Sequence, residues 1–311
     1  MKAGYLGMIL GVSLVLGACG GGGGTTVTAA YIGNRAPADI TVANGETLAS
    51  GGLGGSQSVG GLANATGRPQ GEASGSLILG PIDAITHLVN RSLEKTATRA
   101  TSQARTVSDT LGCSSGGSAY LSFDIPDGGD DFYGYMDFNG CGETGVLIDG
   151  RVDIRGAFAG DVIDGMKLTI RSESPLVVAG SGSSVTLTGT LAMQFDASST
   201  YIDTTLLVEN SDGSIEMLEN FTLEYSDGPV WAHTLHISGR YYHPVEGYVE
   251  IRTTNSLALN PTDIWPFWGS LLLTGAHGSI AQIDIINNAQ YTLSIDEDGD
   301  GNWESSEVVN F

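Results

Sequence analysis

The stretch VTLTGTLAMQF, residues 185–195, alternates large apolar side chains with small or polar ones along most of its length. Successive side chains of a β-strand point to opposite faces, so this period of two predicts a strand with one apolar face. Similar runs recur almost to the C-terminus and begin at Tyr120, Val146, Met166, Thr234, Tyr248, Ser270, Ala281 and Gln290. Short turn signals separate them, among them Asp127-Gly128, Ser211-Asp212-Gly213 and Asn287-Asn288.

These short connections predict hairpins and therefore antiparallel pairing. We expect an all-β fold over residues 113–311, an antiparallel meander of about twelve strands that forms a sandwich or a curved sheet. The apolar face must be buried against another sheet, a helix or a bound ligand.

The period changes between residues 77 and 112. Apolar side chains recur there at three- and four-residue steps, at Ile78, Ile82, Ile85, Val89 and Leu93. Pro81 suits a first helical turn and Gly112 suits a stop. We expect one N-terminal helix over 77–112, packed with its apolar stripe on the sheet.

Residues 19–76 are rich in Gly, Ser and Thr and begin with Cys19 and five consecutive glycines. The segment has few large apolar side chains, and burying them cannot offset the conformational entropy lost on ordering. We therefore expect most of it to be a flexible tether. The patch APADITVANGETL, residues 36–48, is an exception that can dock locally as a short helix or strand.

The first 18 residues have the pattern of a signal peptide, with Lys2 followed by an apolar run over residues 5–18. That run is too short to span a bilayer comfortably, and no other stretch reaches 18 apolar residues. The sequence Leu16-Gly17-Ala18-Cys19 resembles the lipobox of bacterial lipoproteins. The resemblance implies that Cys19 is acylated, becomes the first residue after cleavage, and holds the protein to a membrane. Gly20 in place of Asp fits release to the outer membrane in that family; the periplasmic and surface faces both stay open.

The chain has three cysteines. If Cys19 carries lipid, Cys113 and Cys141 remain, and in an oxidising compartment we expect them to form a disulfide. The alternative is two free thiols or half of a metal site, but no His lies near either cysteine in the sequence.

The stretch DEDGDGNWESSE, residues 296–307, resembles the twelve-residue calcium loop of EF-hands. Carboxylates stand at loop positions 1, 3 and 5, glycine at 6 and Glu at 12. The resemblance implies that calcium is bound by the side chains or backbone of Asp296, Asp298, Asp300, Asn302, Glu304 and Glu307.

The surroundings of this loop depart from an EF-hand. A predicted strand, YTLSI from Tyr291, precedes it where an EF-hand has a helix, and no second loop is present to pair with it. We therefore expect an isolated calcium loop on a β scaffold; the alternative is an acidic, solvated hairpin end.

No catalytic constellation stands out. The G-x-S-x-G match at residues 112–116 lacks the strand-then-helix context of a nucleophile elbow. His233 and His236 would point to opposite faces of a strand, so they cannot chelate together. Aromatic residues concentrate between residues 231 and 268, where they form either a sheet core or a sugar-binding face: Trp231, Tyr241, Tyr242, Tyr248, Trp265 and Trp268.

Composition limits the function classes. Glycine supplies 46 of 311 residues, and the net charge is -22, from 35 acidic and 13 basic residues. Nucleic-acid binders need basic residues to displace counterions, so no nucleic-acid partner is expected. The acidity lies almost entirely in residues 113–311.

The lipobox, the glycine tether, the cysteine pair and the closing GSLLLTGAHGSIAQIDI and DEDGDGNWE segments together resemble uncharacterised β-rich lipoproteins of Gram-negative bacteria. The leading hypothesis is a lipid-anchored envelope protein with a non-enzymatic structural or binding domain stabilised by calcium. One alternative is a carrier or sensor of an apolar ligand on a curved sheet. A second alternative is a glycan-active enzyme.

Overall fold

The structure is a computed structural model. It describes residues 31–60, 85, 87–89, 91, 104–128, 130–143, 145–159, 162–180, 183–196, 199–227, 233–260 and 265–311. The predicted signal peptide, Cys19 and Trp231 lie outside the described residues.

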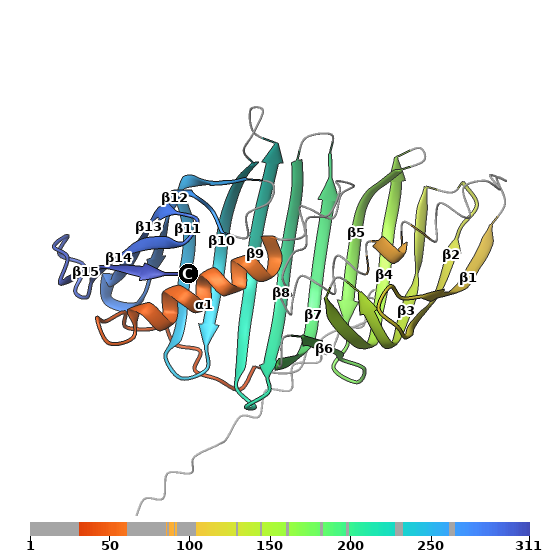
Figure 1. Cartoon of the computed structure of the whole chain (residues 1–311), viewed down its shortest axis with the longest axis horizontal. Helices are drawn as coiled ribbons and strands as arrows, with labels where there is room; N and C mark the ends of the chain where they lie inside the picture. The colour runs from red at the N-terminus through yellow and green to blue at the C-terminus, as the bar shows by residue number, and fades with distance from the viewer. Residues whose placement is uncertain are drawn as a thin grey trace, which may run out of the picture.

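The fold is all-β, as predicted, and the described strands form one antiparallel sheet in which they follow one another in chain order (Figure 1). The exception is β6, which continues the line of β5 and pairs with β4 and β7. The strands are β1 (Arg105–Gly112), β2 (Ser118–Ile125), β3 (Asp131–Glu143), β4 (Val146–Ala159), β5 (Val162–Ile170), β6 (Leu176–Gly180), β7 (Ser183–Phe195), β8 (Ser199–Asn210), β9 (Ile215–Asp227), β10 (His233–His243), β11 (Gly247–Leu259), β12 (Trp268–Thr274), β13 (Ile280–Asn287), β14 (Gln290–Asp296) and β15 (Ser305–Asn310).

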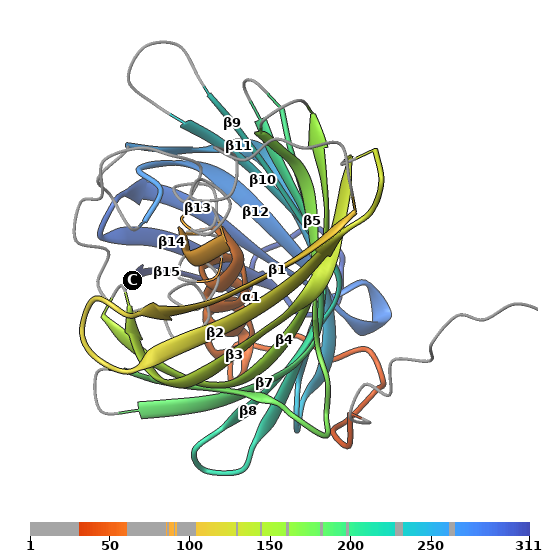
Figure 2. The same cartoon turned by 90° about the vertical axis from the view of Figure 1, so that its right-hand side faces the viewer.

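The sheet is strongly curved, and the helix α1 (Gly45–Gly60) lies on its concave face (Figure 2). Bulges contribute to the curvature because an extra residue increases the local twist. One bulge lies at Gly239, where the pairing of β10 with β9 shifts register and φ is 140°. A Cβ at Gly239 would lie 2.6 Å from the Cα of Phe221, so only glycine fits this close approach.

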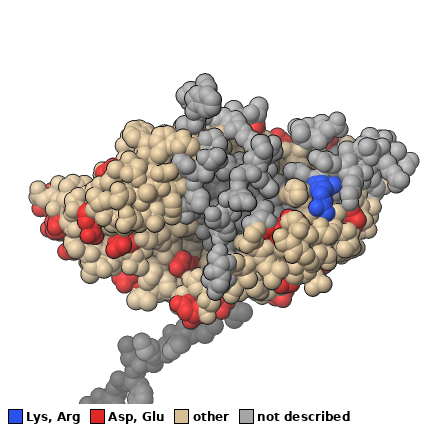
Figure 3. Space-filling view, in the orientation of Figure 1, with Lys and Arg blue, Asp and Glu red and all other residues tan. Residues whose placement is uncertain are grey.

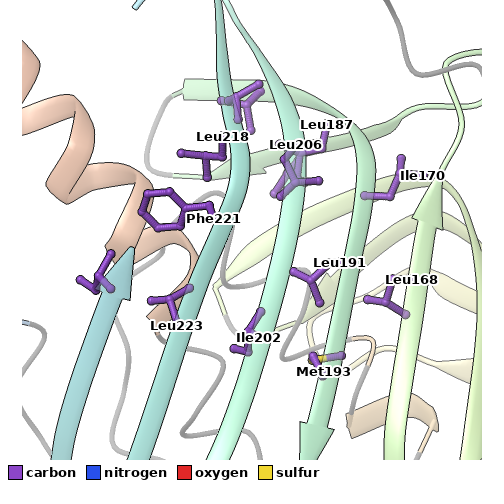
Figure 4. Close-up of a cluster of buried hydrophobic side chains, with 14 of the residues drawn as sticks. Leu168, Ile170, Leu187, Leu191, Met193, Ile202, Leu206, Leu218, Phe221 and Leu223 are labelled. Atoms are coloured by element: carbon purple, nitrogen blue, oxygen red, sulfur yellow. The ribbon is translucent and has the colours of Figure 1, made fainter. Parts of the chain in front are cut away.

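The core lies on the concave face. One row of paired, buried side chains crosses five neighbouring strands: Met166, Met193, Ile202, Leu223 and Ile237. Figure 4 shows members of this row and of the next rows projecting from the same face of the sheet. Burying each such side chain contributes about 1.5–3 kcal/mol, so the alternating pattern of the sequence is also the main source of stability.

Part of the segment expected to be a flexible tether packs on the sheet: residues 36–48 dock there, as the sequence allowed, and so do the neighbouring residues 31–35 and 49–54. Leu48, Ala49 and Leu53 of α1 are buried, and the helix contacts β9, β10, β13 and β14. Glycine is a poor helix former. Here it allows close packing, since a Cβ at Gly51 would overlap the ring of Tyr241. Tertiary contacts rather than helix propensity hold this segment.

Ahead of α1, residues 31–44 run along one edge of the sheet. Pro37 forms a parallel bridge with Tyr248, and Ala276 N donates to Ala38 O at 2.7 Å. We call this side of the sheet, at which β8, β10, β12 and β14 end in turns, the N-terminal edge. It consists of residues 31–44 together with the turns at 211–214, 244–246, 275–279 (which includes the short 3-10 helix η2, Ala276–Gly278) and 297–304.

The predicted helix over 77–112 is correct only in part. Residues 85, 87–89 and 91 are helical, and Ile85, Leu88 and Val89 are buried in the core. Arg105–Gly112 is instead β1, paired with β2. The inward side chains of β1, Val107 and Leu111, are four residues apart, a spacing that fits one face of a helix and one face of a strand equally well.

Cys113 and Cys141 form the predicted disulfide, with their Cα atoms 5.4 Å apart. The bond joins the turn after β1 to β3. Within the described residues, no helix is both long enough and apolar enough to cross a membrane.

Candidate metal centre

The acidic stretch predicted to bind calcium forms the turn between β14 and β15. Asp296 is the last residue of β14 and pairs with Ile280 of β13. Its side chain is buried, with 1% exposure, whereas the residues that follow in the turn are exposed. The sheet therefore fixes the first carboxylate of the group, and the turn brings the others to it.

Backbone amides satisfy the buried carboxylate of Asp296. Gly299 N donates to Oδ1 at 2.7 Å, and Gly301 N donates to Oδ2 at 2.9 Å. Both glycines have positive φ, 73° and 88°, which lets the chain turn back tightly over Asp296. The glycine predicted for the sharp turn at loop position 6 is Gly301.

The next carboxylates are oriented by hydrogen bonds within the turn. Asp300 N donates to Asp298 Oδ1 at 3.1 Å, and Asn302 N donates to Asp300 Oδ1 at 2.8 Å. Asn302 also donates from its side-chain Nδ2 to Asp300 Oδ2 at 2.9 Å. These bonds from Asn302 lower the pKa of Asp300, so its carboxylate is ionised at neutral pH.

Glu304 and Glu297 connect the turn to the rest of the molecule. Glu297 N donates to Glu304 Oε2 at 2.7 Å, and Glu304 N donates to Ile295 O at 2.9 Å. Glu297 Oε1 accepts from Val42 N at 2.6 Å. The turn is therefore bonded to the segment that leads into α1, a contact across 255 residues of sequence.

Four carboxylates converge in this turn. Asp296, Asp298, Asp300 and Glu304 each offer an oxygen, and these oxygens lie within 4.8 Å of one another. Within the described part of the chain, no Lys or Arg forms an ion pair with any of them. Like charges this close repel, so a cation bound among them would stabilise the turn. Acidic side chains gather at this end of the molecule, where β14 and β15 lie (Figure 3).

Glu307 does not join this group. It lies in β15, opposite Leu293 of β14. A strand advances about 3.3 Å per residue, so the start of β15 at Ser305 carries Glu307 away from the turn, where an EF-hand would begin a helix. Burial raises the pKa of the Tyr291 hydroxyl, and the negative charges of Glu46 and then Glu307 raise it further.

A second group with metal-ligand side chains comprises Cys113, Cys141 and Glu143. Its sulfur atoms are joined in the disulfide, so they are not thiolate ligands. The buried Glu143 accepts hydrogen bonds from Ser114 N at 2.8 Å and Ser114 Oγ at 2.6 Å. This group therefore fixes the turn after β1, including the serine of the G-x-S-x-G match.

Over residues 233–260 and 265–268, the histidine and aromatic side chains do not form one surface. His233 is buried and stacks on Tyr225, whereas His236 is exposed and bonded to Ser256. The aromatic side chains are also dispersed. Tyr241 lies under α1, Tyr242 packs with Tyr31 and Tyr248, Trp265 stacks on Phe311, and Trp268 is exposed.

Sequence reasoning missed the connection through Glu297. In the sequence, Glu297 lies between the predicted ligands Asp296 and Asp298 and has no separate role. It contacts a backbone amide, that of Val42, and every residue other than proline has such a group, so the sequence could not indicate this contact.

Comparisons with protein families, with curated proteins and with solved structures gave no match for this chain.

Proposed function

We propose that the protein is a lipid-anchored lipoprotein of the bacterial cell envelope, whose curved sheet is a non-enzymatic structural or binding scaffold stabilised by calcium. The lipobox at Cys19 supports the anchor. The convergence of four carboxylates at one turn carries the calcium part of the proposal.

The chemistry of the turn suits calcium, a hard cation that takes six to eight oxygen ligands. Asp296, Asp298, Asp300 and Glu304 supply carboxylate oxygens, and the backbone carbonyl of Asn302 is a further donor at loop position 7. Glu307 becomes a ligand only if the turn closes toward β15. These donors favour calcium over zinc, which prefers nitrogen and sulfur ligands.

Bound calcium would act on the fold through Glu297 and the Val42 amide, because that bond joins the turn to the N-terminal segment. Neutralising the carboxylates would hold β14, β15 and the start of α1 together. At a calcium concentration ten times the Kd, binding contributes about 1.4 kcal/mol to the free energy of unfolding.

Calorimetric titration with calcium tests this site. We expect one binding site in the wild-type protein and at least roughly tenfold weaker binding in Asp298→Asn, because one charged ligand is removed. Asp212→Asn is the matched control, because Asp212 also caps an exposed turn by bonding Ser214 but lies in the β8–β9 turn. Equal affinity in Asp298→Asn and wild type would contradict the site.

The alternative function, a carrier or sensor of an apolar ligand, would need an open apolar surface on the concave face. This face is lined by Leu, Ile and Met side chains, as an apolar binding surface would be (Figure 4). The side chains of its central rows are already buried, however, for example Leu191 at 2% and Leu223 at 1% exposure. This burial supports a closed core more than an open binding face. The dispersal of the aromatic side chains likewise gives the glycan-active alternative no support.

A further inference from the structure

Four large apolar side chains are exposed along the N-terminal edge. Ile32 is 80% exposed, Val245 72%, Val42 47% and Trp303 44%. Single exposed apolar residues are ordinary on soluble proteins. These four side chains come from three distant parts of the sequence but lie on one edge. Their clustering on that edge therefore needs an explanation.

Hydrogen bonds join the segments that carry them into a continuous edge. Asn34 Nδ2 donates to Val245 O at 3.2 Å, which places Ile32 beside the β10–β11 turn. Asn44 Nδ2 donates to Glu246 Oε2 at 2.8 Å, which places Val42 beside the same turn.

The edge continues from Val42 to the acidic turn. Val42 N bonds Glu297, and Glu297 N bonds Glu304, the neighbour of Trp303. The order along the edge is therefore Ile32, Val245, Val42 and Trp303.

The same edge receives the chain from Cys19. Eleven residues lie between Cys19 and Tyr31, so the twelve Cα–Cα steps of the extended chain span at most ~43 Å. The strands that run from this edge are up to 13 residues long, as in β9 and β11, and carry the opposite edge a further ~43 Å away. The chain that follows Cys19 therefore enters the sheet at the N-terminal edge, so a lipid on Cys19 draws this edge toward the membrane.

We infer that the N-terminal edge rests on the lipid surface that holds the Cys19 anchor, with Ile32, Val42, Val245 and Trp303 in the headgroup region. This inference rests on the proposed lipid anchor. Tryptophan is favoured at membrane interfaces because its ring is amphipathic, and small apolar side chains gain from leaving water there.

Charge decides which lipid surface fits. The edge also carries the exposed Asp39 and Glu297 and the half-buried Glu246, besides the four carboxylates of the acidic turn. A surface rich in anionic lipid would repel these groups. The edge therefore matches zwitterionic headgroups.

Quenching by brominated lipid tests the inference on the full-length, lipidated protein. The vesicles contain phosphatidylethanolamine and brominated phosphatidylcholine, with calcium present, and the probe is tryptophan emission. We expect the brominated lipid to quench tryptophan emission in the wild-type protein and in Trp268→Phe. In Trp303→Phe we expect most of this quenching to be lost.

Trp268 is the matched control because it is 56% exposed at the opposite edge, paired with Ala258 near the far end of β11. Quenching that persists in Trp303→Phe, that disappears in Trp268→Phe, or that is absent throughout would overturn the inference. Flotation of the protein with the vesicles reports the anchor separately. A protein that floats without quenching of Trp303 contradicts only the orientation, and one that does not float contradicts the anchor as well.

Discussion

Gly51 shows how a single residue can decide whether an element docks. In an exposed helix interior, replacing glycine by alanine is favourable because the unfolded chain loses less freedom. At Gly51 an added methyl group would overlap the buried ring of Tyr241. The local preference and the packing therefore oppose each other at this position.

This opposition predicts opposite signs for two alanine substitutions in α1. Gly51→Ala should lower the free energy of unfolding by about 1–3 kcal/mol, the usual cost of overpacking. Gly54→Ala should raise it by about 0.5–1 kcal/mol, because a Cβ at Gly54 meets no atom within 4 Å. Urea denaturation of both variants measures the difference, and destabilisation by the same amount in both would contradict the packing described for α1.

The residues of the candidate site were largely predictable because ligand spacing along a loop is local. Asp296, Asp298, Asp300 and Glu304 are at most eight positions apart, and the structure brings them together. Glu307 was placed by analogy with a helix that this chain does not form. The spacing therefore identified a converging group but not the element that follows it.

The turn after β1 is the clearest case of one element held by covalent and polar contacts together. The disulfide joins Cys113 to Cys141, and Glu143 binds the backbone and side chain of Ser114. Among the described strands, β1 lies at the end of the sheet and pairs with β2 alone, so it has fewer strand contacts than a central strand. The disulfide compensates for that exposed position.

Removing the disulfide should therefore destabilise the protein measurably. The double variant Cys113→Ala/Cys141→Ala should lose about 2–4 kcal/mol of unfolding free energy, since the bond closes a loop between residues 28 positions apart. Denaturation with and without a thiol reductant measures this. Wild type under reductant should match the variant, and an unchanged midpoint in the variant would contradict a stabilising role.

At the scale of elements, the alternation of apolar and polar residues predicted most strands. It failed at β1, where the apolar spacing fits the period of a helix as well as that of a strand. Val107 and Leu111 of β1 fit both a helix and a strand. The sequence allows a short helix or strand as far as Leu48, but the continuation of α1 beyond it is glycine-rich and carries no helix signal. Leu48 and Leu53 are buried where α1 contacts β9, β10, β13 and β14. Contacts distant in sequence supply what the local pattern lacks.

At the scale of the molecule, the sequence left a sandwich and a curved sheet as alternatives. The structure is a single curved sheet with α1 on its concave face (Figures 1 and 2). Bulges such as that at Gly239 contribute to the curvature. The local sequence pattern does not predict the total curvature that results from several such bulges. The path of residues 31–44 was equally beyond local reasoning, because its partners lie more than 200 positions away.

The path of the N-terminal segment links the two parts of the proposed function. Residues 31–44 run along the N-terminal edge, contact Glu297 of the acidic turn, and lead into α1. The proposed membrane anchor, the proposed calcium site and α1 would thus be connected through residues 31–44.

The proposed location and the proposed orientation of the protein both depend on a lipid on Cys19. Mass spectrometry of the N-terminal peptide from the membrane fraction of a Gram-negative host measures it directly. We predict a peptide that begins at Cys19 with a diacyl or triacyl modification, and release of the Cys19→Ser protein from the membrane fraction. An unmodified Cys19, or a Cys19→Ser protein that stays equally membrane-bound, would contradict the account.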